Sequence, residues 1–413
     1  MAVDIAPLRA SRDLRLLVLG EFLTGLGTQA ALVALPYQLY TQTGSAFLTG
    51  LLGGIELVPL IAAGLYGGAI ADRMDRRRLL LVVQIGLVAC AGSLAAGALA
   101  GEPPVWLLYV LGGLLAGFGS IEGVTRTAIV PNLVAPEHLR GAIALTFGLY
   151  QLTAVVGPAA GGLLIAAGGV KVAYLVDAVS CLAMAAAVYR MAPQPPHGEH
   201  ADGAGIWQSI AEGLRFVRGN QALKGSFAID LFAMTFGMPR ALFPVLALSV
   251  YGAGAAGTGA LYAAVSAGAT IAALTTGWLT HARRLGRIVI YAVSVWGLAI
   301  AAVGLVSSLW PAAVCLFVAG AADSVSAVCR STINQTVTPD ALRGRMSSVF
   351  MLVVTSGPRL GDLESGVVAS ATTARFAVGS GGLACLGGVV VVLFAFPALL
   401  RYDAEEALAQ PVS

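Results

Sequence analysis

Long apolar stretches separated by short polar segments run through almost the whole of the 413-residue chain. An α-helix needs about 20 predominantly apolar residues to cross the roughly 30 Å hydrocarbon core of a bilayer. By that criterion the pattern predicts twelve transmembrane helices, over residues 14–40, 46–70, 79–101, 104–128, 138–168, 171–191, 221–250, 257–280, 286–307, 309–331, 342–370 and 374–400. We therefore expect an all-α polytopic membrane protein.

Composition and charge agree with this interpretation. Hydrophobic residues make up 58% of the chain and charged residues only 11%, whereas a soluble domain has about 25% charged residues. The predicted loops on one side hold most of the basic residues, among them Arg73, Arg76, Arg77, Arg78, Arg283, Arg284, Arg287 and Arg330, while the opposite loops "TQTGS" and "GEPP" hold none. Because Lys and Arg favour cytoplasmic loops, we expect both termini on the cytoplasmic side of a bacterial inner membrane.

One long polar segment, "APQPPHGEHADGAG" at residues 192–205, separates six spans from the other six. The next residues, up to 220, repeat apolar side chains at helical spacing and predict a short amphipathic helix at the membrane surface. The expected organisation is an N-terminal six-helix bundle over residues 1–191, a cytoplasmic linker over 192–220, a C-terminal six-helix bundle over 221–401 and a cytoplasmic tail over 402–413.

The two groups of spans share landmarks in the same order. "APEHLRGAIAL" precedes the fifth span and "TPDALRGRMSS" precedes the eleventh. Within these spans, Gly157 and Pro158 correspond to Gly357 and Pro358. Such a repeat predicts two pseudo-symmetric bundles around a site near the middle of the membrane, which is the organisation of many secondary transporters.

The segment after the second span resembles a known family motif. Gly68, Asp72, Arg73, Arg76 and Arg77 have the spacing of the loop between helices two and three in the major facilitator superfamily. The stretches "DLFAMTFGMPRALFPVLA" and "SGPRLGDLESG" resemble the enterobactin-exporter branch and its actinobacterial multidrug-efflux relatives. The resemblance covers nearly all twelve spans. It implies the major facilitator fold and a monomeric exporter in which proton influx drives alternating access.

The resemblance also implies a gate at the cytoplasmic ends of the helices. Asp72 is expected near Arg345 at the start of the eleventh span, where free backbone N–H groups attract an acid. Arg73 or Arg76 is expected to pair with Glu122 at the end of the fourth span. The same gate would include Gly68, Arg77 and Arg126. The residues by themselves leave open a simpler interpretation, in which the arginines only orient the chain.

Several ionisable residues are expected inside the membrane, where a charge is costly and a function is the first hypothesis. At 1.5 Å per residue, Glu56 and Asp230 lie about 15 Å into their spans, near the midplane. A carboxyl group removed from water holds its proton more readily, so both acids are candidate proton carriers. Further candidates for proton coupling or the substrate cavity are Glu21, which could instead be a partner at the cytoplasmic end, Asp323, and Arg240 as a contact for an anionic substrate. Structural ion pairs are the alternative, and for Arg359 and Asp362, three residues apart, they are the favoured interpretation.

The leading hypothesis is a proton-coupled exporter of small organic molecules, with a siderophore or a lipophilic drug as cargo. Antiport is implied by Gly157, Pro158, Gly161 and Gly162, which match the family's Gly-Pro motif in the fifth helix. A facilitator or importer of a small solute on the same fold is the alternative. The sequence holds no nucleophile–base pair, metal-ligand cluster or phosphate-binding loop. We therefore expect no enzyme, cofactor or metal centre, and the expected partners are a small molecule, protons and the lipid bilayer rather than nucleic acid.

Overall fold

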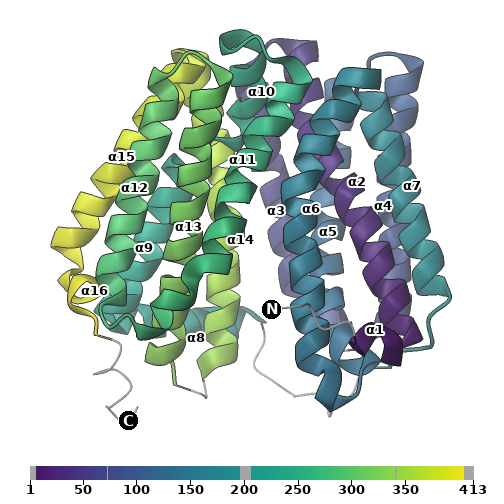
Figure 1. Cartoon of the computed structure of the whole chain (residues 1–413), viewed down its shortest axis with the longest axis horizontal. Helices are drawn as coiled ribbons and strands as arrows, with labels where there is room; N and C mark the ends of the chain where they lie inside the picture. The colour runs from purple at the N-terminus through teal and green to yellow at the C-terminus, as the bar shows by residue number, and fades with distance from the viewer. Residues whose placement is uncertain (1–5, 72, 196–205, 340–341, 404–413) are drawn as a thin grey trace. The chain divides into compact units, whose positions relative to one another are not determined.

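The computed structural model describes residues 6–71, 73–195, 206–339 and 342–403, which form helices and short connections without any strand (Figure 1). Within these residues, eleven helical segments are long and apolar enough to cross a membrane. They are Arg12–Thr43, Ala46–Gly68, Arg76–Ala100, Val105–Leu133, Pro136–Gly168, Val170–Tyr189, Gln221–Val250, Gly254–Leu279, Leu285–Leu305, Leu309–Val337 and Ala374–Ala395. The predicted all-α polytopic fold is confirmed.

The remaining predicted span corresponds to helix α14 (Arg343–Ala371), which has 29 residues and is long enough to cross the membrane. It is less apolar than the others because it carries Arg359, Asp362 and Glu364 along its length. Asp362 is only 5% exposed, so its charge is covered by protein. Charged side chains inside a membrane bundle face the protein or a polar path, and α14 supplies the twelfth predicted helix on that basis.

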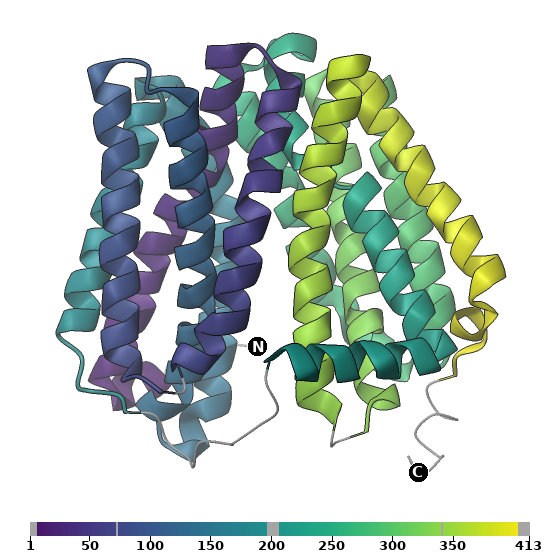
Figure 2. The same cartoon turned by 180° about the vertical axis from the view of Figure 1, so that it is seen from behind.

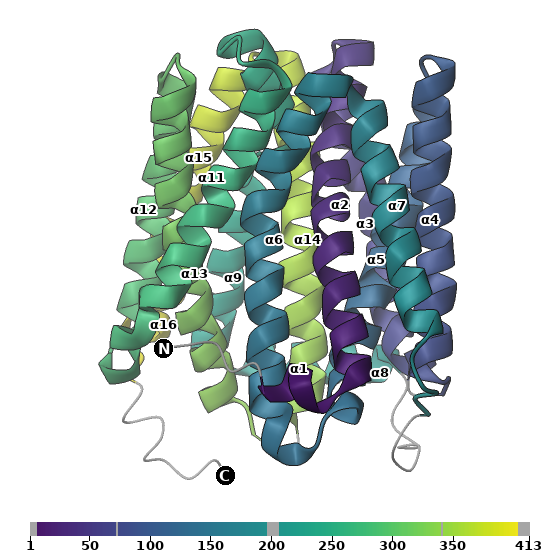
Figure 3. The ribbon, with the colours of Figure 1, turned by 45° about the vertical axis from the view of Figure 1, so that its right-hand side comes forward.

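The helices form two compact units, which are described separately. Unit 1 comprises the described residues within 1–44, 55–202 and 253–263. Its helices are α1 (Ala6–Ala10), α2 (Arg12–Thr43), most of α3 (Ala46–Ala71), α4 (Arg76–Ala100), α5 (Val105–Leu133), η1 (Pro136–His138), α6 (Leu139–Gly168), α7 (Val170–Tyr189) and the first turns of α11 (Gly254–Thr275). One apolar cluster joins α2, α5, α6 and α7 through Leu17, Ile129, Leu145 and Met184 (Figure 3).

Unit 2 comprises the described residues within 45–54, 203–252 and 264–413. It contains the first turns of α3, the rest of α11 and the helices α8 (Ile206–Gly219), α9 (Gln221–Phe236), η2 (Arg240–Leu242), α10 (Phe243–Val245), η3 (Leu246–Val250), η4 (Thr276–His281), α12 (Leu285–Leu305), α13 (Leu309–Val337), α14, α15 (Ala374–Ala395) and α16 (Pro397–Arg401). Each unit thus includes a short segment from the other half of the sequence. The predicted boundaries of bundles, linker and tail stay predictions.

The seventh predicted span crosses as one segment but is not one continuous helix. α9 ends at Phe236, and the chain continues through Gly237 and Pro239 into the short helices η2, α10 and η3. A proline lacks the backbone N–H that would continue the helical hydrogen bonds. The break is held by Trp296 of α12, whose Nε1 donates a 2.8 Å hydrogen bond to the Gly237 carbonyl. It places Arg240 at the start of a new helical turn.

The segment expected to form a linker helix is α8, which lies across the lower ends of its neighbours in unit 2 (Figure 2). Its residues Ile210 and Val217 are buried. A Cβ atom on Gly213 would lie 2.7 Å from Cγ2 of Val349 and 3.0 Å from the carbonyl oxygen of Arg345. Glycine at this position therefore permits the close approach of α8 to the first turn of α14.

Candidate functional site

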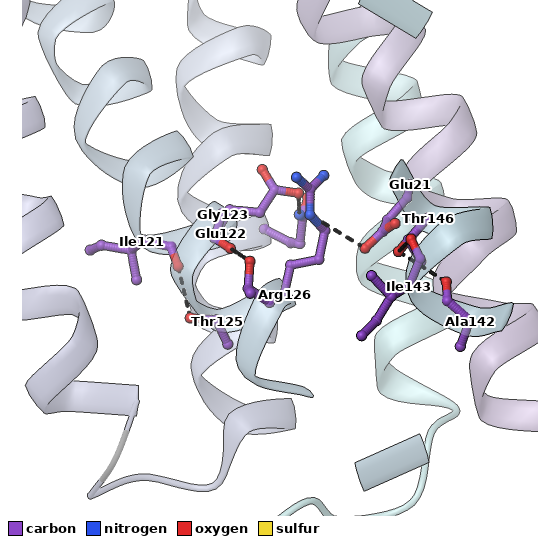
Figure 4. A network of polar contacts seen from close by, with 11 residues as sticks. Glu21, Ile121, Glu122, Gly123, Thr125, Arg126, Ala142, Ile143 and Thr146 are labelled. Carbon is purple, nitrogen blue, oxygen red and sulfur yellow. Dashed lines mark hydrogen bonds and ion pairs between the residues drawn. The ribbon is translucent and has the colours of Figure 1, made fainter. Parts of the chain in front are cut away.

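Two acids share one arginine in the interior of unit 1 (Figure 4). Glu21 of α2 is 9% exposed, and its Oε1 lies 3.7 Å from Nε of Arg126 on α5. One turn earlier on α5, Glu122 interacts with the same arginine and accepts a 2.7 Å hydrogen bond from Nε2 of Gln84 on α4. The Arg126 guanidinium also lies over the Tyr150 ring of α6, 5.5 Å from its centre. The cluster therefore connects four helices through a single cation.

The arginines at the start of α4 bind backbone carbonyls of neighbouring helices. Arg76 donates a 2.8 Å hydrogen bond to the Ala128 carbonyl near the end of α5. Arg77 donates to the Val188 carbonyl at 3.1 Å, in the last turn of α7, where carbonyl groups carry partial negative charge. The expected pairing of Arg76 with Glu122 is therefore wrong. Glu122 lies deeper in the unit, where Gln84 and Arg126 satisfy it.

Asp75, in the same segment, has a role that the sequence analysis missed. Its Oδ1 accepts a 2.9 Å hydrogen bond from the Arg78 backbone N–H, so Asp75 caps the N-terminus of α4. Its Oδ2 accepts a 2.8 Å hydrogen bond from the Gln194 backbone N–H. An acid immediately before an apolar helical run is a recognised start signal. That signal identifies the cap, although it does not identify Gln194 as the second donor.

The other expected gate residues have separate surroundings. Asp72 lies outside the described residues, so its expected place near the start of α14 stays a prediction. Arg345 pairs with Glu212 of α8, with 2.5 Å between Nη1 and Oε2. Arg73 is exposed, and a Cβ atom on Gly68 would meet no atom within 4 Å. Close packing therefore does not require a glycine at position 68.

The Gly-Pro motif lies in the middle of α6, where its glycines contact neighbouring backbones. A Cβ atom on Gly161 would lie 2.6 Å from Cα of Ala30 on α2. A Cβ atom on Gly162 would lie 2.7 Å from the Ala255 carbonyl oxygen, at the start of α11. Gly157 likewise faces α2, and Pro158 follows it inside the helix. The motif allows α6 to pack tightly against two helices of unit 1.

Unit 2 contains a second arginine that lies between two acids. Arg330 of α13 is 3% exposed and pairs directly with Asp230 of α9. Its Nη2 also lies 3.6 Å from Oδ1 of Asp323 on α13. Arg330 was expected at the cytoplasmic end of the tenth predicted span, but it lies further inside the helix than that. α13 continues to Val337, six residues beyond the predicted end of this span, so Arg330 lies inside the helix.

Arg240 lies close enough to Asp323 and Asp362 for its charge to act on both acids. Asp362 also accepts a 2.8 Å hydrogen bond from the Ala241 backbone N–H, which anchors η2 to α14. Nη1 of Arg359 lies 3.8 Å from Oδ2 of Asp362, so the ion pair expected from their spacing is confirmed. Arg240 is thus surrounded by acids, which limits its freedom to bind an anionic substrate.

Comparison with known proteins identifies the family. The chain matches the family model described as transmembrane secretion effector over residues 2–411. It is 31% identical over 414 residues to the enterobactin exporter EntS of Shigella boydii serotype 4, covering 97% of this chain and 95% of that protein. EntS of Escherichia coli O157:H7 gives the same identity and coverage. The chain belongs to this family of the major facilitator superfamily.

Solved structures of other transporters share the fold of this superfamily member. A bacterial homologue of the human lysosomal transporter Spinster, in an inward-facing and unoccupied conformation, matches with a TM-score of 0.72 at 15% identity and covers 96% of this chain and 97% of its own. A POT family transporter in complex with 5-aminolevulinic acid matches with a TM-score of 0.73 at 11% identity, covering 94% and 97%. Such low identities show the fold alone. Family membership makes the chain a multi-pass membrane transporter of small molecules and not an enzyme.

The ionisable residues inside the spans of this transporter are distributed unequally between its units. Away from the helix ends, the described part of unit 1 holds four acids and one arginine: Glu21, Glu56, Glu122, Asp177 and Arg126. The described part of unit 2 holds four acids and three arginines: Asp230, Asp323, Asp362, Glu364, Arg240, Arg330 and Arg359. A buried carboxylate is stabilised by a cation or is neutralised by a proton. Among these residues, unit 1 therefore has three more acids than arginines and unit 2 only one more.

Proposed function

We propose that this transporter is a proton-coupled exporter of small organic molecules and that a siderophore is its cargo. The observation that carries the proposal is the 31% identity, over 97% of the chain, to proteins named enterobactin exporters. In this proposal it works as a monomer in a bacterial inner membrane, with both termini in the cytoplasm. Protons that move inward drive the cargo outward by antiport, through alternating access.

The acids of unit 1 support proton coupling. Glu21 and Glu122 compete for Arg126, and only Glu122 lies on the same helix as that arginine. A proton on Glu21 would weaken its pairing with Arg126 and so release α2 from α5. A proton on Glu122 would have the opposite effect, because Arg126 would then pair with Glu21 alone. Proton binding can therefore change how tightly two helices are held together, which a coupled transporter requires.

The remaining candidate proton carriers fit this proposal in different ways. Asp230 is held by Arg330, so it gains a proton only when that ion pair opens. Asp323 makes the longer contact with the same arginine, 3.6 Å between its Oδ1 and Nη2 of Arg330. Glu56 of α3 is buried and adds to the acid surplus of unit 1. We assign Asp323 and Glu21 to proton binding first.

The cytoplasmic gate belongs to the same proposal. Arg345 is engaged by Glu212 of α8, so Asp72 could bind the start of α14 only in competition with Glu212. Arg76 and Arg77 hold the start of α4 against α5 and α7. Arg73 stays a gate candidate on the strength of its exposure and its place in the motif. The antiport role of the Gly-Pro motif in α6 is likewise a proposal.

Transport into reconstituted vesicles tests the function. We expect enterobactin to accumulate against its gradient in vesicles with an acidic lumen, and the lumen to become less acidic as it does so. Glu21→Gln should lower this accumulation by about tenfold or more, since the variant cannot cycle a proton, yet leave exchange of cargo without a pH gradient intact. Glu102→Gln, in an exposed loop, is the matched control. Equal accumulation with and without the pH gradient would identify a facilitator and reject proton coupling.

A further inference from the structure

One face of α13 changes from apolar to polar halfway along the helix. Asp323, Ser326, Arg330 and Asn334 are three or four residues apart, so they lie on one side of a helix with 3.6 residues per turn. Toward the Leu309 end, the same side carries Leu316, Ala319 and Gly320. Polar side chains in such a line inside a membrane segment call for an explanation, because each is costly to bury.

The polar half of this face holds buried atoms that lack hydrogen-bond partners. Among the described residues, none forms a hydrogen bond with any of four buried atoms: Oγ of Ser326, Nε of Arg330, Oδ1 of Asn334 and Oδ1 of Asp323. Ser326 is fully buried. Buried polar groups are nearly always satisfied by protein or by ordered water, and an unsatisfied one costs about 1–3 kcal/mol. Four such atoms along one helix face are best accounted for by water that runs along it.

The line of polar groups meets apolar residues at one end and runs toward the C-terminal end of α13 at the other. Asp323 also lines a small pocket, together with the apolar side chains of Phe243, Trp296 and Leu316 and with Gly320 among others. Apart from Asp323, the side chains that line this pocket are apolar or, for Trp296, already hydrogen-bonded, so a water chain finds no further side-chain partner beyond Asp323. In the other direction the line reaches Asn334, three residues before the end of α13 at Val337. From Asp323 to Asn334 the distance along the helix is about 16 Å.

The charges that face this line are balanced. Asp230 comes from α9 and pairs with Arg330, while Arg240 comes from η2 and acts on Asp323. Arg240 also acts on Asp362 of α14, and near the Val337 end Asp403 acts on Tyr402, whose hydroxyl group forms a hydrogen bond with that of Thr336. A fixed arginine excludes protons from a narrow path when its charge is uncompensated. Here the ion pair with Asp230 compensates it.

We propose that this face of α13 is a hydrated track through which Asp323 exchanges protons with the Val337 end of the helix. The inference rests on the proposed proton coupling and adds Ser326 and Asn334 to its residues. A proton leaves the Asp323 carboxyl for the nearest water, passes along hydrogen-bonded waters beside Ser326 and Asn334, and enters the solution there. The carboxylate left behind is stabilised by Arg330 and Arg240. Because water finds no further side-chain partner beyond Asp323 at the other end, the exchange is one-sided.

Infrared spectroscopy of the protein in lipid bilayers tests the track without any cargo. The C=O stretching band of a protonated carboxyl group is assigned to Asp323 if it is present in the spectrum of the wild type and absent from that of Asp323→Asn. Its shift after transfer from H2O to D2O measures how fast that proton exchanges. We expect the Ser326→Ala/Asn334→Leu double variant to slow this exchange by about tenfold or more relative to the wild type, as expected when the hydrogen-bonding groups that hold the water are removed. Thr332→Val, on an exposed part of α13, should leave the rate unchanged.

An unchanged exchange rate in the double variant overturns the track, and so does the absence of an Asp323 band across the pH range. If the double variant folds poorly, Ser326→Ala alone decides. Loss of a dry, unpaired hydroxyl group would raise thermal stability without affecting exchange, whereas loss of a hydrated one slows exchange. Failure of the proposed function is recognised separately, because a transporter without pH-driven accumulation in vesicles lacks coupling whatever the infrared band shows.

Discussion

At the scale of single residues, Arg330 shows what keeps a charge stable in the interior of this protein. Its side chain lies between Asp230 and Asp323, almost entirely out of contact with solvent. Taking ions out of water costs several kcal/mol each, and the attraction between partners offsets that cost only while both are present. The stability of each of the three side chains therefore depends on the other two. The free-energy cost of a substitution depends on which buried charge it leaves without a partner.

Removing one partner should be worse than removing two. Arg330→Met leaves Asp230 buried beside Asp323 without its cation, and we expect it to lower the free energy of unfolding by about 3–5 kcal/mol. Adding Asp230→Leu removes the uncompensated acid and should restore a large part of that loss. Denaturant titration of the purified protein in detergent measures both. A double variant no more stable than Arg330→Met alone would show that the pair is not the main contribution.

The site was predictable from the sequence as far as it depends on depth, and not where it depends on pairing. Counting along the spans was enough to place Glu21, Asp230 and Asp323 within long helices. The ion-pair partner lies on another helix for Glu21 and Asp230, and about two turns along the same helix for Asp323. The predicted span ends at residue 331, one residue after Arg330, so Arg330 was placed at the cytoplasmic end of the span, whereas the helix continues to Val337. Pairing is a tertiary property, and no pattern along one segment contains it.

At the scale of helices, glycine decides which backbones come close. In unit 1 the Gly162 backbone meets Ala255 and Gly259 at the start of α11. In unit 2 the start of α3 meets α14, where a Cβ atom on Gly50 would lie 2.8 Å from Cα of Gly366. Inside lipid there is no hydrophobic drive between helices, so this close packing is a main source of their association.

A pair of substitutions on α6 separates packing from helix propensity. Gly162→Ala places a methyl group against the Ala255 backbone and should destabilise the protein. Gly148→Ala lies on the same helix with no atom within 4 Å of the new methyl group. It should be neutral or stabilising by up to about 1 kcal/mol, the difference in helix propensity. Thermal unfolding of the two variants measures this, and equal effects would mean that the close approach of α6 and α11 contributes little.

The sequence predicted the helices better than the way in which they are interrupted. Every predicted span overlaps a helix, since about 20 apolar residues in a row have few other stable forms. The break after Phe236 was not predicted, although Gly237 and Pro239 signal it, because a Pro or Gly inside a membrane helix is often accommodated without a break. Here the break persists because Trp296 binds the Gly237 carbonyl.

At the scale of the whole molecule, the number of crossings and the distribution of arginines are independent signals that must agree. Five membrane-crossing segments lie between the loop at Glu102 and the loop at Arg284. An odd number of crossings puts these two loops on opposite sides of the membrane whichever way the chain is inserted. The excess of arginine around Arg284 then selects the side, since basic loops stay in the cytoplasm. The family match establishes a multi-pass transporter, and this argument adds its orientation as a prediction.

Cysteine labelling in intact cells tests both signals at once. Glu102 and Arg284 are exposed, and of the five native cysteines only Cys315 is not buried, so a Cys315→Ser background keeps other labelling low. We expect Glu102→Cys to react with a membrane-impermeant maleimide added outside, and Arg284→Cys to react only after permeabilisation. If Arg284→Cys reacts from outside and Glu102→Cys only after permeabilisation, the predicted orientation is wrong but the number of crossings between the two loops still holds. Labelling of both from the same side would contradict the crossings themselves, because no orientation of a chain with five segments between these loops allows it.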